Sequence, residues 1–337
     1  MISILAEWEG LRHDGRPIND LDRICMTQNP QLQGLLELIH GNDAPATGSL
    51  GPEAAREGYI TLHSMVDPTD VPIGKVEDMS FKHAKVDVPV RVYTPVAAPG
   101  GALPCLIFFH GGGFVIGDLE SHDALCRQLA NDSGCRVVAV DYRLAPEHQF
   151  PAAVDDAYAA VQWVEAQAGN LGIDANRIGV AGDSAGGNLA AVVSQMSTKL
   201  NGPKISIQLL IYPGVQASGD MPSITENGKG YMLEKATLEW FGSLYVPEGV
   251  DTTDPRLSPL LAEDVSGLPP AYIVTAQFDP LRDEGKAYAD RLESAGVSVT
   301  HMHYDDMIHG FFNMTKLVEE GREAVRDAGK ALKSALA

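Results

Sequence analysis

The sequence predicts an α/β fold in which a mostly parallel central sheet is flanked by helices. Two observations support this prediction. From about residue 80 onward, short apolar runs rich in β-branched residues alternate with amphipathic segments of helix length, and glycine closely follows most of those segments. This alternation favours parallel strands, because each helix carries the chain back to the edge of the sheet where the next strand starts.

Six apolar runs are the predicted strands of this sheet. They are Leu103–Phe109, Arg136–Asp141, Arg177–Ala181, Ile205–Tyr212, Ala271–Ala276 and Val297–Tyr304. Five amphipathic segments are the predicted helices, namely Ser121–Asp132, Ala152–Ala168, Ala185–Leu200, Leu281–Ala295 and Lys316–Leu336. Ahead of them, Phe81–Val86 and Val88–Tyr93, separated by Asp87, predict an antiparallel hairpin at one edge of the sheet.

The N-terminal part of the chain lies outside this alternation. Residues 1–60 contain one good helix candidate, in which Asn29 is the cap and Pro30 occupies the first turn. The apolar face of that helix is formed by Leu32, Leu35, Leu36 and Ile39. Gly41–Gly58 is rich in Gly, Pro and Ala, so we expect a flexible connection there.

A second interval also breaks the alternation. No strand pattern occurs between Pro213 and Pro269, and an apolar helical stretch is expected from Tyr231, Met232, Leu233, Leu238, Trp240, Phe241 and Tyr245. We expect this excursion and the N-terminal segment to form a helical cap over the site. The predicted organisation is an N-terminal cap segment and linker (1–60), the first part of the core (61–212), a further cap contribution (213–247) and the second part of the core (248–337).

Composition excludes several classes of protein. The 337 residues carry 25 Lys and Arg against 45 Asp and Glu, a formal net charge of −20. Such a surface repels phosphate backbones and anionic lipids, so neither nucleic-acid binding nor stable membrane association is expected. The N-terminus lacks the layout of a secretory signal, and the four cysteines (Cys25, Cys105, Cys126 and Cys135) form no CxxC pair. We therefore expect free thiols and a cytoplasmic location.

The residues that directly follow the predicted strands are the candidates for chemistry, because ligands of open α/β sheets bind at the carboxyl ends of the strands. Gly182-Asp183-Ser184-Ala185-Gly186 lies between a strand and a helix and matches the pattern GxSxG. In this pattern a tight turn exposes the serine hydroxyl, and the two glycines leave room for the turn. Ser184 is therefore the candidate nucleophile; a glycine-rich helix start or an anion-binding turn is the alternative.

A serine hydroxyl becomes a good nucleophile only when a base removes its proton and an acid holds that base in one tautomer. Asp279 and His309 each come after a predicted strand, and the order Ser184, Asp279, His309 is the order of a known group of hydrolases. The alternatives are a helix cap for Asp279 and an ordinary loop histidine for His309. Other acids near the expected position are Asp283, Asp305 and Asp306.

The run His110-Gly111-Gly112-Gly113-Phe114 follows another predicted strand. Successive glycines let the main chain turn its amides toward a developing oxyanion, and we expect the donors to be the N–H groups of Gly112, Gly113 and Ala185. A merely flexible loop is the alternative. The candidate substrate pocket comprises Phe114, Leu233, Leu238 and Phe241.

Together with Tyr142–His148 and Phe150–Asp156, the motifs HGGGF, GDSAGG, DPLRDEG and HGF resemble the hormone-sensitive-lipase family of carboxylesterases, the bacterial family IV type of the α/β-hydrolase superfamily. The resemblance covers roughly residues 70–315, and GDSAG with DPLRDEG is similar to the bacterial esterase branch. It implies an α/β-hydrolase fold with a cap and no metal or organic cofactor. It also implies Ser184 as nucleophile, Asp279 as acid, His309 as base, and Gly112, Gly113 and Ala185 as the oxyanion hole.

The expected function is that of a serine carboxylesterase acting on short- to medium-chain acyl esters through an acyl-enzyme intermediate. The expected partner is a small-molecule ester substrate. Whether the chain forms a homodimer is left open by the sequence. The alternatives are an amidase, formamidase or lactonase with the same triad, and a non-catalytic small-molecule receptor on the same fold. His301 and His303 share one face of a strand, which metal sites sometimes use, although two solvent-facing residues are the simpler interpretation.

Overall fold

The structure is a computed structural model that describes residues 29–41, 49 and 51–337. The strands are β1 (Lys75–His83), β2 (Val86–Thr94), β3 (Leu103–Phe109), β4 (Arg136–Val140), β5 (Ile173–Asp183), β6 (Ile207–Ile211), β7 (Ala271–Phe278) and β8 (Val299–Ile308). They form an eight-stranded sheet in the order β1-β2-β4-β3-β5-β6-β7-β8. Strands β3 to β8 run parallel, whereas β1 and β2 are antiparallel to their neighbours. The predicted fold class is confirmed.

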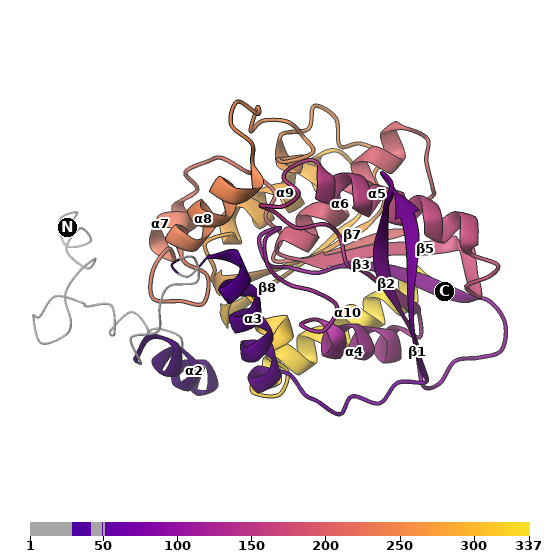
Figure 1. Cartoon of the computed structure of the whole chain (residues 1–337), viewed down its shortest axis with the longest axis horizontal. Coiled ribbons are helices and arrows are strands. Elements are labelled where there is room, and N and C mark those ends of the chain that lie inside the picture. The colour runs from indigo at the N-terminus through magenta and orange to yellow at the C-terminus, as the bar shows by residue number, and fades with distance from the viewer. Residues whose placement is uncertain (1–28, 42–48, 50) are drawn as a thin grey trace, which may run out of the picture.

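Helices cover both faces of the sheet (Figure 1). The helices of the described residues are α2 (Pro30–Gly41), α3 (Pro52–Val66), α4 (Asp123–Ser133), α5 (Ala152–Gln167), α6 (Ala185–Lys199), α7 (Pro222–Glu226), α8 (Lys235–Tyr245), α9 (Arg282–Ser294) and α10 (Glu319–Ala335). Leu106 and Phe108 of β3 belong to the apolar core shared with α4 and α10, whereas Ile107 and Phe109 belong to the core shared with α5, α6 and α9. This alternation follows from the two-residue period of a strand.

The edge hairpin is confirmed, but its turn lies elsewhere than expected. Ala84 and Lys85 form the turn with φ values of 47° and 67°, and Asp87 pairs with Lys82 inside the ladder. The predicted turn at Asp87 is therefore wrong. Two residues with positive φ match the right-handed twist of the flanking strands, and this geometry was hidden because neither residue is Gly or Asn.

The N-terminal helix is confirmed as α2. The Asn29 side chain accepts a hydrogen bond from the N–H of Gln31 at 3.1 Å, and the apolar face is buried through Leu32, Leu35 and Leu36. The expected flexible connection Gly41–Gly58 lies partly outside the described residues, and from Pro52 onward it is wrong. There the chain forms α3, which starts with Pro52 in its first turn and crosses the expected boundary at residue 60.

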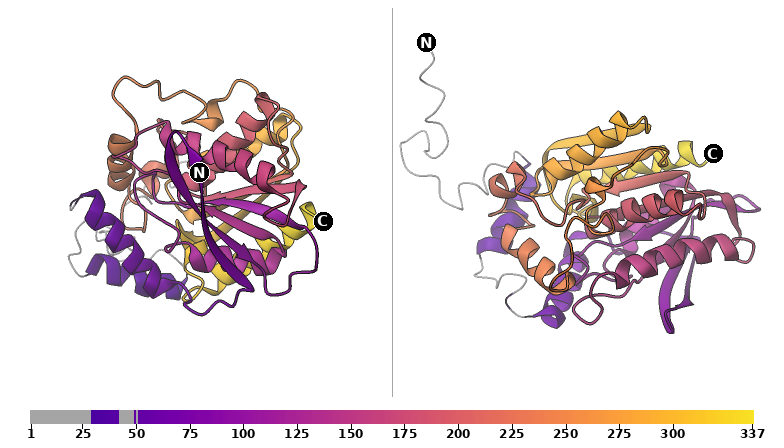
Figure 2. Two further views of the ribbon diagram at one scale, coloured as in Figure 1. Left: turned by 45° about the vertical axis from the view of Figure 1, so that its right-hand side comes forward. Right: turned by 90° about the horizontal axis from the view of Figure 1, so that it is seen from above.

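The two segments expected to form a cap lie at one end of the sheet. Helices α3, α7 and α8 gather beyond the carboxyl ends of the parallel strands (Figure 2). The predicted apolar helix of the excursion is α8, which begins at Lys235, so Tyr231 to Leu233 form an irregular segment ahead of it.

Candidate active site

Ser184 lies at the sharp turn between β5 and α6. Its backbone has φ 55° and ψ −116°, a region that L-residues rarely adopt. A Cβ atom added to Gly186 would lie 1.9 Å from the carbonyl oxygen of Phe109, and one added to Gly182 would lie 2.3 Å from the backbone of Gly186. The two glycines are therefore required because the turn packs directly against itself and β3.

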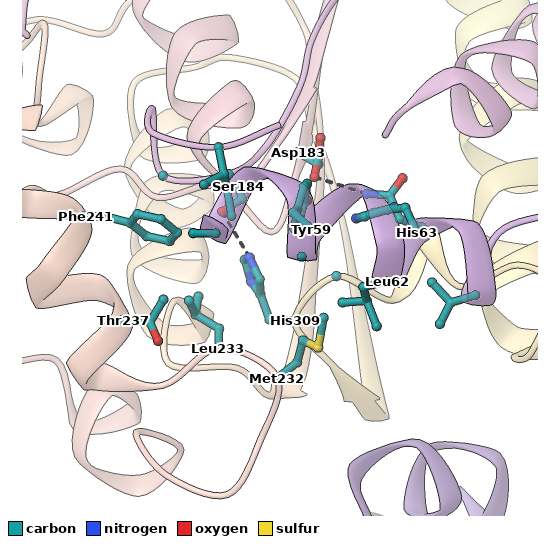
Figure 3. A pocket seen from close by; sticks show the side chains of 18 of the residues that line it. Tyr59, Leu62, His63, Asp183, Ser184, Met232, Leu233, Thr237, Phe241 and His309 are labelled. Atoms are coloured by element: carbon teal, nitrogen blue, oxygen red, sulfur yellow. Dashed lines mark hydrogen bonds between the residues drawn. The ribbon is translucent and has the colours of Figure 1, made fainter. Parts of the chain in front are cut away.

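Three side chains that are distant in sequence meet at this turn. Ser184 Oγ lies 3.0 Å from His309 Nε2 (Figure 3). On the other side of the imidazole, His309 Nδ1 lies 2.7 Å from Asp279 Oδ2. Asp279 is fully buried, and its Oδ1 accepts the N–H of Leu281 at 2.8 Å. With Nδ1–H donating to the carboxylate, Nε2 is free to accept the serine proton.

The other acids considered for this position face elsewhere. Asp283 pairs with Arg282 and accepts the N–H of Ser223, and the Asp305 side chain is 94% exposed. Asp306 lies 3.5 Å from the Asn29 side chain. Asp279 does cap the chain locally through its Oδ1, which accepts the N–H of Leu281, while its Oδ2 lies beside His309 Nδ1.

The glycine run after β3 forms a tight turn. The carbonyl of Gly112 accepts the N–H groups of Val115 and Ile116 at 3.1 and 2.9 Å, with φ 114° at Gly112 and 60° at Gly113. Within the described residues, the N–H groups of Gly112, Gly113 and Ala185 donate to no protein acceptor. These donors are thus available for an anionic oxygen, as in an oxyanion hole.

Two cavities meet at Ser184 and share Gly113, Leu233 and Phe241. The first, of about 320 Å³, is lined by His309 and by side chains of the cap, including Tyr59, Leu62, His63, Val66 and Met232. The second, of about 500 Å³, is lined by α8 residues such as Leu238, Gly242 and Tyr245, together with Phe114, Asn188 and Glu284. All four residues of the predicted pocket lie on these walls. The α3 residues were missed because no helix was expected across the boundary at residue 60 between the N-terminal segment and the core.

A second contact of α3 with the site was also missed. The Arg56 guanidinium donates to the carbonyls of Val115 and Ala145, both at 2.9 Å, and forms a two-pronged ion pair with Glu147. Planar guanidinium groups suit such multiple acceptors. Arg56 therefore joins the cap helix to the segment that follows the oxyanion glycines.

The two histidines on β8 contact a threonine of the neighbouring strand β7. His301 Nε2 and His303 Nδ1 both lie 2.9 Å from the Thr275 hydroxyl. Neither histidine lines the two cavities at Ser184. The pair thus belongs to the packing between β7 and β8.

Glu284 is a buried carboxyl group in the wall of the second cavity. Its Oε1 accepts the N–H of Val215 at 2.7 Å, and burial raises the pKa of Glu284 to about 8. In the unfolded chain the group titrates near 4.5. Between these pH values the folded state retains a proton that the unfolded state has lost, so stability falls as pH rises through about 8.

Replacing Glu284 by glutamine should therefore stabilise the protein more at alkaline than at acidic pH. The amide keeps an acceptor for Val215 and cannot ionise. We expect the difference in Tm between Glu284→Gln and the wild type to increase from pH 5 to pH 9 in thermal unfolding followed by circular dichroism. A difference that stays constant over this range would show that Glu284 does not titrate with a raised pKa.

Comparisons with known proteins agree with this geometry. Residues 106–313 match the family model described as the alpha/beta hydrolase fold. The carboxylic ester hydrolase LipN of Mycobacterium tuberculosis is 46% identical over 248 residues, which cover 72% of this chain and 65% of LipN, so the match spans less than two thirds of that relative. The carboxylesterase NlhH of the same organism is 42% identical over 295 residues, covering 86% and 91% of the two chains.

A solved structure gives a similar result. The ester hydrolase from the metagenome of Lake Arreo, complexed with a derivative of bipyridine phosphonate, has a TM-score of 0.89 and 42% identity over 91% of this chain and 98% of that one. Among the described residues, no helix combines the length and apolarity that crossing a membrane requires. The family match and these relatives show that the chain belongs to the hormone-sensitive-lipase-like family of α/β hydrolases.

Proposed function

We propose that this protein is a serine carboxylesterase that hydrolyses short- to medium-chain acyl esters through an acyl-enzyme intermediate. The observation that carries the proposal is the 3.0 Å contact between Ser184 Oγ and His309 Nε2, with Asp279 behind the imidazole. The relatives named as ester hydrolases and carboxylesterases support it. A cytoplasmic location stays a prediction from the sequence, which leaves the oligomeric state open.

Each group has a defined step in the reaction. His309 Nε2 takes the Ser184 proton while Oγ attacks the ester carbonyl carbon, and the N–H groups of Gly112, Gly113 and Ala185 stabilise the resulting oxyanion. When the intermediate collapses, the leaving oxygen takes the proton from His309 and departs as the alcohol. Water then attacks the carbonyl carbon of the acyl-enzyme through the same steps, and the carboxylic acid leaves.

The position of His309 indicates which part of the ester binds in each of the two cavities. The leaving oxygen must lie beside the imidazole that protonates it, and His309 lines only the first cavity. We therefore place the alcohol part of the ester in the first cavity, against α3, and the acyl part in the second, against α8. The second cavity, of about 500 Å³, accommodates acyl chains of short to medium length.

Gly242 gives a test of this assignment. It lines the second cavity from α8, and a Cβ atom added there meets no atom within 4 Å. In Gly242→Phe the new ring should occupy space that a longer acyl chain needs. We expect kcat/KM for p-nitrophenyl hexanoate to fall about 10-fold or more, with little change for the acetate.

The control for this variant is Ser243→Phe, which places the same ring on the exposed side of α8. It should leave the ratio of hexanoate to acetate activity unchanged. An unchanged ratio in Gly242→Phe, or a selective loss of acetate activity, would place the acyl chain outside the second cavity.

The proposed reaction class is tested by comparing matched substrates. We expect rapid turnover of p-nitrophenyl butyrate and much slower turnover of the corresponding p-nitroanilide and of a γ-lactone. Faster hydrolysis of the anilide or the lactone would favour an amidase or a lactonase. Saturable binding of the ester without release of nitrophenol would favour a receptor.

A further inference from the structure

Asp183, the residue before the nucleophile, connects three segments of the site. The residue is 2% exposed. Its Oδ1 accepts the N–H of Gly111 at 2.8 Å and lies 3.1 Å from His122 Nε2, and its Oδ2 lies 3.3 Å from Asn313 Nδ2. One carboxylate therefore joins the glycine run, the residue that precedes α4 and the segment that follows His309.

The contact with Gly111 fixes the backbone that carries the oxyanion donors. Gly111 directly precedes Gly112 and Gly113, and a Cβ atom added to it would lie 2.4 Å from Asp183 Oδ2. The carboxylate thus packs against this peptide as well as accepting its N–H. A shift of Asp183 must move the Gly112 amide, because one peptide unit separates the two N–H groups.

The charge of Asp183 is balanced by His122. Burial alone would raise the pKa of Asp183, but the charge and hydrogen bond of His122 lower it overall. Burial would likewise lower the pKa of His122, and Asp183 raises it instead. The other titratable groups around the pair are Tyr59 and His63 of α3, Asp67 directly after α3, Cys126 of α4, and His110, Asp118, Tyr142, Tyr212 and His309.

A carboxylate without this counter-charge would oppose the negative charge that develops on the substrate oxygen. We infer that Asp183 and His122 form a buried ion pair that positions the oxyanion amides through Gly111 and cancels the field of the carboxylate at the oxyanion. Asp183 and His122 are thus positioning residues for the proposed esterase reaction, on which this inference rests. Neither side chain takes part in bond making or in proton transfer with the substrate.

Three variants test the pair by kcat for p-nitrophenyl butyrate per active site, with sites counted by titration with an organophosphate. Asp183→Asn removes the charge; its carbonyl oxygen can keep the contacts of Oδ1 with Gly111 and His122, and its amide N–H₂ then lies beside the Asn313 side chain. His122→Gln keeps a donor but leaves the carboxylate uncompensated. Each change should lower kcat about 10- to 100-fold, with KM within about threefold, because the ground-state ester does not need the oxyanion donors. The double variant restores neutrality and should lose clearly less than the product of the two single losses.

Asp156→Asn is the matched control. Asp156 is also a fully buried carboxylate that accepts a backbone N–H and pairs with a cation, in both cases from Arg143, and it lines neither cavity. It should lower Tm and leave kcat per active site unchanged. If Asp183→Asn and His122→Gln behave like this control, with lower Tm and unchanged kcat per site, the inference is wrong. Absence of ester turnover in the wild type would instead refute the proposed function.

Discussion

Replacing Ser184 by alanine should lower kcat for p-nitrophenyl butyrate by about 10⁴- to 10⁶-fold. The change removes the hydroxyl oxygen that we propose forms the acyl-enzyme, and it leaves the backbone turn in place because alanine meets the same restriction at φ 55°. The initial rate of nitrophenolate release measures the effect, and thermal unfolding should show a Tm close to that of the wild type.

Ser194→Ala is the control for this prediction. Ser194 is a fully buried serine on the same helix, α6, and its hydroxyl donates to the carbonyl of Ala190. Its loss should leave kcat within about twofold of the wild-type value, because the hydroxyl only donates to a backbone carbonyl of its own helix. Retention of more than about a tenth of wild-type activity in Ser184→Ala would show that another group attacks the ester.

Replacing Asp279 by asparagine should lower kcat by about 10³- to 10⁴-fold. The asparagine carbonyl can still accept the N–H of Leu281, so its amide N–H₂ turns toward His309 Nδ1. Nδ1 must then accept a hydrogen bond, which moves the imidazole proton to Nε2, where the base must be free. The measurement is kcat at the pH optimum of the wild type.

Asp283→Asn is the matched control, because Asp283 is a neighbouring acid that pairs with Arg282 and not with His309. It should keep kcat within about threefold. A larger loss in Asp283→Asn than in Asp279→Asn would contradict the assignment of the acid.

Local patterns predicted most of the fold and the meeting of Ser184, Asp279 and His309. Each of these residues follows a buried strand, and in a parallel sheet the carboxyl ends of the strands share one edge. The structure strengthens this relation, because β7 runs to Phe278 and β8 to Ile308, so that Asp279 and His309 are the next residues of the chain.

The parts that could not be predicted depend on contacts between distant residues. Arg56 meets the carbonyl of Val115, 59 positions later, and Asp183 meets the N–H of Gly111, 72 positions earlier. No period of two or 3.6 residues encodes such contacts, and in isolation Arg56 is an ordinary charged residue. The cap helix α3 was missed for a local reason, since its Gly and Pro residues occur equally in loops and at helix starts.

The central claim is that the Ser184 hydroxyl forms the covalent intermediate. Diethyl p-nitrophenyl phosphate tests this directly, because attack by an activated serine forms a stable Oγ–P bond and releases p-nitrophenolate. We predict one nitrophenolate per chain and one diethylphosphoryl group, located by mass spectrometry on the peptide that contains Ser184, with no labelling of Ser184→Ala. Labelling at another residue would contradict the account. So would a wild-type protein that stays unlabelled after this treatment and continues to hydrolyse esters.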